Sequence, residues 1–421
     1  MTNKQIGLLA ISLIFLISVA ISFGHTAQAK NLRVWGRTNQ LEEVVNRFNE
    51  EMKKAGRDVK ATYTLVPWGQ QSEKFMSALA AQNAPDVYSF GIARIGRFLP
   101  MGAFRDITER AKDLPYYDEY PKTLLNAGSY NDTLYALPYN VDLSALLYNK
   151  DLFAEAGLDP EEPPETWQEL INYGKKLTQD TDEDGAIEQW GFAVQSYTGF
   201  WYLPLLWANG GEFSNQNCEV LYNSPEAVET MEFWVDLVHE HKIAPKSSIS
   251  WKSDARYNAF ITEKLAMFLG GNFNITTIQK DAPNLEYGVT YLPKPKDGHF
   301  SSFAGGNVIG ITSQSKNPSL AWEFIKFATS KDVMIDVMAK NRVLPGRPNL
   351  FDNKYFNKLE GMQKFASILE VADYPKCQYQ SAFNSEFALY LEKALRKEIS
   401  PKTAVEKTAE AMKDIVEEER G

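Results

Sequence analysis

Aromatic side chains stand at the ends of several short apolar segments of this sequence. Trp35, Trp68 and Phe90 each lie where such a segment ends, and Arg37 follows the first of them closely. An aromatic ring can stack on the apolar C–H face of a sugar, while carboxylate, amide and guanidinium groups bond the hydroxyl groups at its rim. Such a site needs few residues, fixed on facing walls. These residue types therefore favour binding of a polyhydroxylated ligand.

Carboxylates alternate with other residues in a second segment, between positions 180 and 188. Alternating oxygen ligands with glycine at the sixth position match the first part of a calcium-binding loop. The twelfth position is Gly191 rather than a bidentate Glu, so Glu188 at the ninth position would have to substitute. The segment is either a structural calcium site or an acidic surface turn, and no other cofactor is expected. The candidate ligands are Asp180, Asp182, Asp184, Ala186 and Glu188.

Several signatures of catalysis are absent from the sequence. His239-Glu240-His241 lacks the spacing of a zinc helix motif, and neither a Gly-x-Ser-x-Gly elbow nor a phosphate loop occurs. A secreted glycoside hydrolase stays open as an alternative, because it needs an aromatic sugar site and two carboxylates roughly 5–9 Å apart. The 54 acidic residues always offer such pairs, so ligand binding without turnover would have to separate the two classes.

Length and charge narrow the classes further. The chain has 421 residues, which predicts two lobes or domains, and its net charge of −10 argues against nucleic acid as a partner. Trp, Tyr and Phe make up an unusually high 13% of the residues.

The first 29 residues predict export. Lys4 is the only charge before Lys30, and residues 6–23 form an uncharged, mostly apolar run. Small residues at Ala27 and Ala29 match the positions that a signal peptidase reads. We expect cleavage after Ala29 and a soluble periplasmic protein, with an uncleaved membrane anchor as the alternative.

Hydrophobic periodicity supplies the elements that would position the aromatic residues. Strand, helix, strand, helix and strand are predicted in turn, with the strands at 32–35, 59–65 and 85–90. This order predicts a parallel sheet, in which ligands bind beyond the carboxyl ends of the strands. Further along, Thr166 and Glu169 form a capping box that begins another helix.

The two cysteines, Cys218 and Cys377, lie far apart in the sequence. An oxidising compartment would permit a disulfide between them, and two separate buried thiols fit the sequence equally well.

Eight segments, taken in order, carry a family resemblance. They are YNDTLYALP (130–138), LYNKDLF (147–153), AGL (156–158), PETWQEL (164–170), ANGG (208–211), LAMFLGG (265–271), LP (292–293) and AWEF (321–324). This ordered set resembles the family 1 extracellular solute-binding proteins of ABC importers, the group that includes the maltose-binding protein. Each segment is weak alone, but together they run along essentially the whole chain after residue 29.

The resemblance implies an α/β fold of two lobes, each a mainly parallel sheet flanked by helices, with the ligand in a cleft between them. The first lobe is expected at 30–140 with about 299–345, and the second at 141–298 with about 346–421. The hinge is expected near 139–143, 298–304 and 343–350. By the same resemblance we expect a sugar-binding protein that is not an enzyme and docks on a membrane permease, and we expect it to be a monomer.

The resemblance also marks ligand-binding positions. Phe90 and Phe273 stand where the family places stacking tryptophans, and these two departures disfavour maltose itself. Asp142 is expected to accept sugar hydroxyls near the first crossover, and Arg347 to reach the ligand from a return segment. The full set is Trp35, Arg37, Trp68, Phe90, Arg94, Asp142, Tyr197, Trp201, Asn209, Gly271, Asn272, Phe273, Gly306, Arg347 and Tyr379.

Two alternatives keep the same fold. One is a binding protein that feeds a chemosensor, and the other binds a polyol or a glycerophosphodiester. Arg37, Arg94 and Arg347 are too few cations to argue for phosphate, so an uncharged sugar or oligosaccharide is the main expectation.

Overall fold

The computed structural model describes residues 30–196 and 199–420. The predicted signal peptide and Tyr197 lie outside these ranges. The first strand begins at Lys30, the residue after the predicted cleavage site. Within the two described ranges, none of the helices combines the length and the apolar character needed to cross a bilayer.

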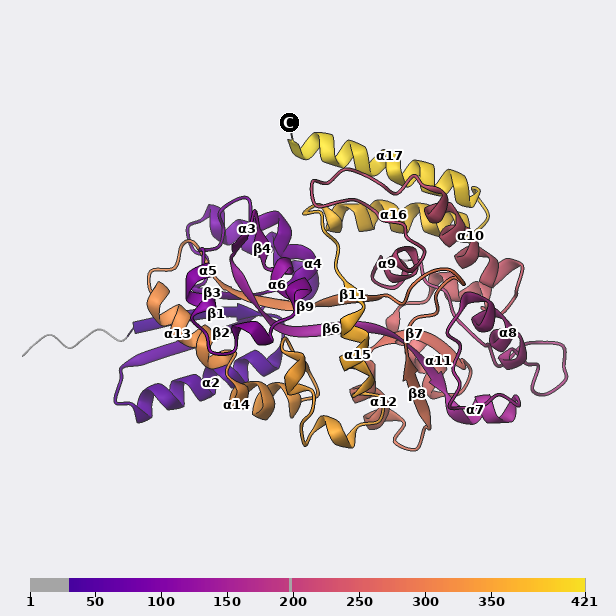
Figure 1. Cartoon of the computed structure of the whole chain (residues 1–421), viewed down its shortest axis with the longest axis horizontal. Helices are drawn as coiled ribbons and strands as arrows, with labels where there is room; N and C mark the ends of the chain where they lie inside the picture. Colours follow the sequence, from indigo (N-terminus) through magenta and orange to yellow (C-terminus); the bar gives the residue numbers. More distant parts are fainter. Residues whose placement is uncertain (1–29, 197–198, 421) are drawn as a thin grey trace, which may run out of the picture.

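The chain alternates strands and helices along most of its length (Figure 1). The strands are β1 (Lys30–Gly36), β2 (Val59–Leu65), β3 (Val87–Gly91), β4 (Ser129–Tyr130), β5 (Thr133–Leu134), β6 (Ala136–Asn149), β7 (Met267–Gly271), β8 (Tyr287–Thr290), β9 (Ser302–Ile311), β10 (Leu344–Pro345) and β11 (Ala372–Asp373). The longer helices are α2 (Asn39–Lys54), α3 (Gln71–Ala80), α8 (Trp167–Leu177), α9 (Gly199–Ala208), α10 (Pro225–His239), α11 (Ser253–Ile261), α12 (Asn272–Asp281), α13 (Pro318–Ala328), α16 (Gln380–Leu395) and α17 (Pro401–Arg420). The shorter ones are α4 (Ile92–Ile95), α5 (Thr108–Lys112), α6 (Lys122–Ala127), α7 (Lys150–Glu155), α14 (Lys331–Val333) and α15 (Lys364–Glu370).

The predicted strand–helix alternation at the start of the chain is confirmed. Strand β1 pairs in parallel with β2 on one side and with β3 on the other. Helix α2 buries Leu41, Val45 and Phe48 on one face against this sheet's core. The carboxyl ends of β1, β2 and β3 therefore meet at one edge, which is where Trp35, Trp68 and Phe90 were expected to gather.

One long strand joins the two lobes. Strand β6 pairs with β9 from Ala136 to Leu143, and then with β7 from Ser144 onward. Figure 1 shows β6 and β9 crossing the middle of the molecule, with the indigo start of the chain on one side and helices α8 to α12 on the other. This change of partner falls directly after the predicted hinge segment 139–143. It marks the point at which β6 leaves the sheet of the first lobe and enters the sheet of the second.

The strand directions differ from the expectation of mainly parallel sheets. Strands β7 and β8 both run antiparallel to β6, and β9 runs antiparallel to β3 and β6. The two-lobe α/β fold is confirmed, while parallel pairing is found for β1 with β2 and β3, and for β11 with β9.

The structure confirms one predicted helix start and shows how the two cysteines are paired. The side chains of Thr166 and Glu169 form the predicted capping box at the start of α8. Cys218 and Cys377 form a disulfide, although the sequence equally allowed two separate thiols. The disulfide joins the connection between α9 and α10 to the segment that leads into α16.

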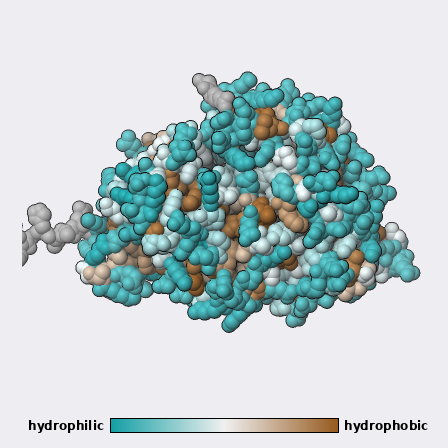
Figure 2. Space-filling model, in the orientation of Figure 1, coloured by the Kyte–Doolittle hydropathy of each residue, from teal (hydrophilic) through white to brown (hydrophobic). Residues whose placement is uncertain are grey.

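Aromatic side chains account for much of the core of each lobe. In the second lobe the ring of Trp167 stacks on Phe233 at 4.0 Å, and Trp234 is buried with its Nε1 donating to the Gln195 carbonyl. The face shown in Figure 2 is largely hydrophilic, with apolar side chains in small patches. Most of the aromatic excess in the sequence is therefore interior packing.

Candidate ligand-binding site

Four polar side chains form a connected network where β6 changes partner. Arg37, just after β1, donates through Nη2 to Asp142 at 2.6 Å and through Nε to the side-chain oxygen of Asn307 at 3.0 Å. The Asn307 amide in turn donates to the side-chain oxygen of Asn140 at 2.6 Å. We call Arg37, Asn140, Asp142 and Asn307 the crossover cluster. It links the segment after β1 to β6 and to β9.

An exposed tryptophan lies directly beside the crossover cluster. Trp68 follows β2 and is 41% exposed, and its ring has the guanidinium carbons of Arg37 and Arg94 at 5.1 Å and 4.5 Å from its centroid. A side chain on Gly91 would collide with this ring, because an added Cβ would lie 2.2 Å from it. The bare backbone of Gly91 thus lets the indole lie flat against the first lobe with much of its surface open.

The second lobe supplies an exposed ring close to the same point of β6. The Asn272 side chain is buried and accepts a hydrogen bond from the Leu143 backbone at 2.8 Å. Phe273, the next residue, is 42% exposed and lies 6.3 Å from the buried ring of Trp201. An added Cβ on Gly271 would meet the Phe273 ring at 2.6 Å. Phe273 is therefore held at the crossover by its neighbours and keeps a free face.

Two glycines keep the backbone bare beside the crossover cluster. Gly306 has a φ of +100° and packs against the Asn140 carbonyl, where a Cβ would come within 2.2 Å. Gly305, which pairs with Asp142, has the ring of Phe200 nearby at 3.2 Å from an ideal Cβ. A side chain at either position would fill the space or strain the backbone.

Sequence reasoning missed three residues that the structure brings to this place. Asn140 lies two residues before Asp142, and residues two apart share one face of a strand, so that signal was available. Phe200 lies next to Trp201 and contacts Phe303 at 4.6 Å, but only the fold reveals that it approaches Gly305. Asn307 follows Gly305 and Gly306 in the sequence, but only the fold shows that its side chain joins Arg37 to Asn140.

Two aromatic residues expected to contact ligand are interior instead. Phe90 is 0% exposed and its ring is packed between Phe75, Tyr88 and Phe98. Strand β3 lies between β1 and β9 and is buried on both faces, so the end of this strand points into the core. The expectation for Phe90 is wrong. Trp35 is also largely buried, with its ring against Tyr88.

Arg347 does not face the space between the lobes. It is 1% exposed, donates to Glu119 at 2.7 Å and to the Thr329 carbonyl at 3.1 Å, and lies over the Tyr116 ring. These partners belong to the first lobe, so two of the guanidinium nitrogens hold the segment that follows β10 against that lobe, while the buried Nε finds no acceptor among the described residues. The prediction that Arg347 reaches the ligand is wrong for this physical reason.

Asn209 and Tyr379 are also engaged elsewhere. The Asn209 amide donates to Glu226, Glu229 and Thr230 of helix α10. Tyr379 is largely buried in the second lobe's core, two residues after the disulfide cysteine Cys377. The structure therefore gathers Arg37, Trp68, Arg94, Asp142, Gly271, Asn272, Phe273 and Gly306 around the crossover, with Trp201 behind Phe273, and leaves Trp35, Phe90, Asn209, Arg347 and Tyr379 out of open contact.

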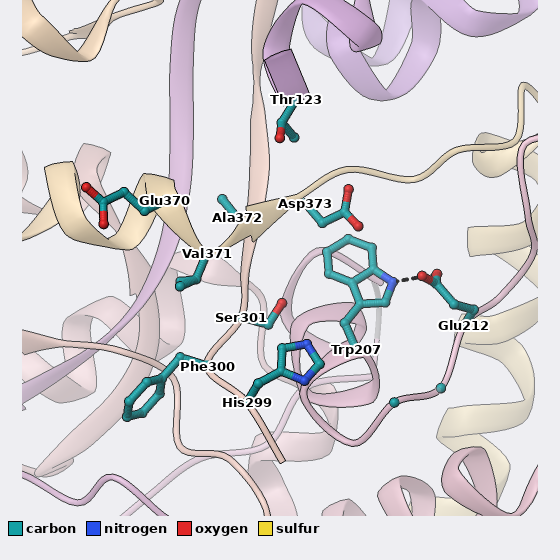
Figure 3. A pocket seen from close by; sticks show the side chains of 12 residues that line it. Thr123, Trp207, Glu212, His299, Phe300, Ser301, Glu370, Val371, Ala372 and Asp373 are labelled. Atoms are coloured by element: carbon teal, nitrogen blue, oxygen red, sulfur yellow. Dashed lines mark hydrogen bonds between the residues drawn. The ribbon is translucent and has the colours of Figure 1, made fainter. Parts of the chain in front are cut away.

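A cavity of about 630 Å³ lies at a different place (Figure 3). Thr123 from α6, Trp207 at the end of α9, and His299 before β9 line it, together with the β11 segment. The Trp207 ring nitrogen donates to Glu212 at 2.9 Å across one wall. None of the residues expected to bind ligand lines this cavity, although it includes part of the predicted hinge segment 298–304.

The acidic segment folds into a compact turn after α8. Oxygen atoms of Asp180, Asp182, Asp184 and Glu188 all lie within 4.8 Å of one another. Two ligands on opposite sides of a calcium ion are about 4.6–5.2 Å apart, so the spacing suits that ion. The Asp180 Oδ1 atom is buried and accepts no hydrogen bond from the described residues, while its Oδ2 accepts one from the Gly185 backbone.

The sequence and the fold of this chain match those of known proteins. The model of the bacterial extracellular solute-binding protein family matches residues 43–364. The sugar-binding protein MalE from Xanthomonas citri superposes with a TM-score of 0.82 at 20% identity, covering 93% of this chain and 98% of that one. This likeness shows that the two-lobe fold is shared.

Two relatives have named ligands. An arabinooligosaccharide-binding protein from Bacillus subtilis is 23% identical over 300 residues, which span 69% of this chain and 66% of that protein. The sn-glycerol-3-phosphate-binding periplasmic protein UgpB from Salmonella typhimurium is 27% identical over 296 residues, or 67% of this chain and 66% of that protein.

Proposed function

This chain belongs to the bacterial extracellular solute-binding proteins, and on that premise we propose that it captures a carbohydrate by closing its two lobes around it. The loaded protein then delivers the ligand to the permease of an ABC importer. It acts as a monomer in the periplasm, after cleavage at Ala29. A ligand that contacts both lobes favours the closed population, because it binds that arrangement more tightly than the open one.

One observation carries the proposal. Trp68 from the first lobe and Phe273 from the second are both exposed rings beside the crossover cluster. Rings on the two lobes can stack on sugar faces, while Asp142, Arg37 and Asn307 offer acceptors and donors for hydroxyl groups. Exposed rings on two lobes, next to a few convergent polar groups, are the arrangement found in ligand-binding grooves.

The structure favours binding over hydrolysis. Glycoside hydrolysis needs two carboxylates on either side of the scissile bond. Within residues 30–196 and 199–420, Asp142 is the one carboxylate of the crossover cluster, and its Oδ2 is engaged by Arg37 at 2.6 Å. A polyol phosphate is a second candidate ligand, because the Salmonella relative binds sn-glycerol 3-phosphate.

Titration calorimetry with a panel of mono- and oligosaccharides tests the proposal. We expect one carbohydrate to bind, to raise the melting temperature and to change intrinsic Trp fluorescence, while chromatography detects no shortened product. Trp68→Ala and Phe273→Ala should each weaken its binding roughly tenfold or more. Tyr130→Ala, which removes an exposed ring on β4 that is not part of the crossover cluster or the Trp68 contacts, is the matched control and should bind normally. If only a non-carbohydrate binds, the proposal is wrong.

We also propose that the turn at residues 180–188 holds a structural calcium ion. Four clustered carboxylates repel one another, and a divalent cation would relieve that repulsion. Asp180, Asp182, Asp184 and Glu188 would supply side-chain oxygens, and Ala186 a backbone carbonyl. Calcium should raise the melting temperature by roughly 2–4 °C at a concentration well above the dissociation constant, and a chelator should reverse this.

The calcium proposal has a charge-matched control. Asp182→Asn with Asp184→Asn should abolish the calcium-dependent shift. Glu410→Gln with Glu417→Gln removes the same charge from the exposed side of α17 and should keep it. A wild-type melting temperature that does not respond to millimolar calcium would rule out the ion.

A further inference from the structure

The wall around Trp68 is built from cations. The guanidinium carbons of Arg94 and Arg37 lie 4.5 Å and 5.1 Å from the centre of the Trp68 ring. The Lys74 ammonium lies 5.1 Å from the ring of Trp35, the neighbouring tryptophan at the end of β1. These charges come from three separate segments of the first lobe. Their convergence is a product of the fold and not of a basic stretch of sequence.

The positive charge of this wall is only partly neutralised. Asp142 pairs with Arg37 at 2.6 Å. Across residues 30–196 and 199–420, however, no carboxylate lies within ion-pair distance of Arg94 or Lys74, and the Arg94 guanidinium makes no hydrogen bond. Contact with an aromatic face compensates a cation less fully than an anion does. Arg94 is thus a partly buried charge without a counterion.

The charged guanidinium of Arg94 is half-buried in this wall. Burial disfavours the charged form and lowers the pKa of the guanidinium. Leaving a charge in such a place is unfavourable unless a partner compensates it. Directly behind the wall, the buried side-chain nitrogen of Gln71 also finds no acceptor among the described residues. The wall therefore offers more donors and positive charge than Asp142, its paired carboxylate, compensates.

The wall faces the other lobe. Arg94 lies on α4, and its neighbour Ala93 packs against the core of the second lobe. An added Cβ on Gly96, at the end of α4, would come within 3.2 Å of the Gln378 backbone of the second lobe. A ligand group bound at Arg94 would consequently be enclosed when the lobes meet, where its charge is poorly screened by water.

The cations around Trp68 stand out because the protein as a whole is acidic. The chain carries a net charge of −10, so an anion meets general repulsion except where cations have been gathered. We infer that the ligand carries an anionic group, a carboxylate or a phosphate, which Arg94 and Arg37 bind above the Trp68 ring while the rest of the carbohydrate reaches Phe273. This inference rests on the proposed function and narrows its substrate class.

The geometry gives the two arginines different tasks. Arg94 has its guanidinium donors available and can bind a carboxylate or phosphate with two parallel hydrogen bonds. Arg37 already shares its charge with Asp142 and is fixed by Asn307, so it adds a positioned donor rather than a full charge. A neutral sugar would hydrogen-bond the same groups but would leave the Arg94 charge uncompensated on closure.

Calorimetry with ligands that differ only in charge tests the inference. Glucose, glucuronate and glucose 6-phosphate form one matched set, and maltotriose with an oligogalacturonate of equal length extends it to oligosaccharides. We expect an anionic member to bind at least tenfold more tightly than its neutral counterpart, with affinity that falls as salt is raised. The carboxylate and phosphate arms of the panel identify which anion is preferred.

Arginine variants connect that preference to the wall. Arg94→Gln should weaken anion binding roughly tenfold to hundredfold and weaken binding of a neutral sugar by a clearly smaller factor, because the neutral sugar loses a hydrogen bond but no charge partner. Arg94→Lys keeps the charge and should keep the salt dependence. Arg57→Gln, which removes an exposed cation paired with Glu323, is the charge-matched control. Melting curves of each variant verify folding.

The outcomes separate the inference from the proposed function. If a neutral carbohydrate binds as tightly as its anionic counterpart, or Arg94→Gln changes both equally, the inference is overturned and the proposed function stands. If no carbohydrate of either charge binds while another anion does, the proposed function is the one that fails.

Discussion

Removing the disulfide should measurably destabilise the protein. Cys218 and Cys377 are 159 residues apart in sequence, and their Cα atoms lie 4.9 Å apart in the fold. A cross-link of this kind restricts the unfolded chain more than the folded one. For a closed loop of this length the chain-entropy model gives about 5 kcal/mol at 25 °C, and natural disulfides generally contribute roughly 2–5 kcal/mol.

The variant Cys218→Ser with Cys377→Ser isolates this contribution. Both cysteines are buried in the second lobe's core, and serine is close to cysteine in size, so the packing change is small. With an unfolding entropy of about 2.1 cal/mol/K per residue, a loss of roughly 2–5 kcal/mol lowers the melting temperature by roughly 2–6 °C when the chain unfolds as one unit. Differential scanning calorimetry measures both quantities.

A reductant provides the internal control. Wild-type protein unfolded and scanned in a phosphine reductant should match the double variant, and the double variant itself should not respond to the reductant. Thiol titration of the unfolded, unreduced wild type should find no free thiol. Equal melting temperatures with and without the cross-link, or two titratable thiols, would refute the reasoning.

Three further predictions follow from single contacts. Gly91→Ala should displace the Trp68 indole, because the added Cβ would lie 2.2 Å from the ring. Ligand affinity should fall roughly tenfold while the melting temperature changes little. Gly69→Ala, whose Cβ meets nothing within 4 Å, is the control variant and should bind normally. Arg97→Gln removes an exposed ion pair to Glu419 that joins the first lobe to α17. The melting temperature should shift by no more than about 1 °C, because exposed ion pairs contribute little to stability. The radius of gyration of the ligand-free protein should rise in small-angle scattering, and an unchanged radius would contradict a role of this pair in lobe closure. Burial raises the pKa of Tyr287 and of Tyr374 to about 12, whereas tyrosines in the unfolded chain ionise at about pH 10. The unfolded state therefore loses these protons first, and the urea midpoint of unfolding should fall as the pH rises from about 10 to about 12. A urea midpoint that stays constant over that range would contradict this prediction.

Strand–helix alternation, helix caps and the order of family segments were readable because each depends on neighbours in sequence. The capping box of Thr166 and Glu169 needs only three residues' spacing, and the structure forms it. The same logic placed β1, α2, β2, α3 and β3 in order. The family resemblance placed Asp142 near the first crossover, and β6 begins to pair with β7 two residues later, at Ser144.

The sequence did not predict the direction in which the side chain at the end of a strand points. Phe90 and Trp68 both end strands of the same sheet, yet one is enclosed and the other is open. The enclosure of Phe90 follows from β9 covering β3, and β9 begins more than two hundred residues later. Arg347 likewise looked free in the sequence, but Glu119 and the Thr329 carbonyl engage it in the first lobe.

By itself, then, the sequence predicted an export signal and determined the two-lobe α/β class, and its family resemblance pointed to a carboxylate near the crossover at Asp142. Only the tertiary structure decided that Cys218 pairs with Cys377, that Arg37 is shared with Asp142, and that Arg94 is left without a counterion. The physical reason is that secondary structure and caps are set by contacts a few residues apart, whereas burial and charge compensation depend on which distant segments the fold brings together.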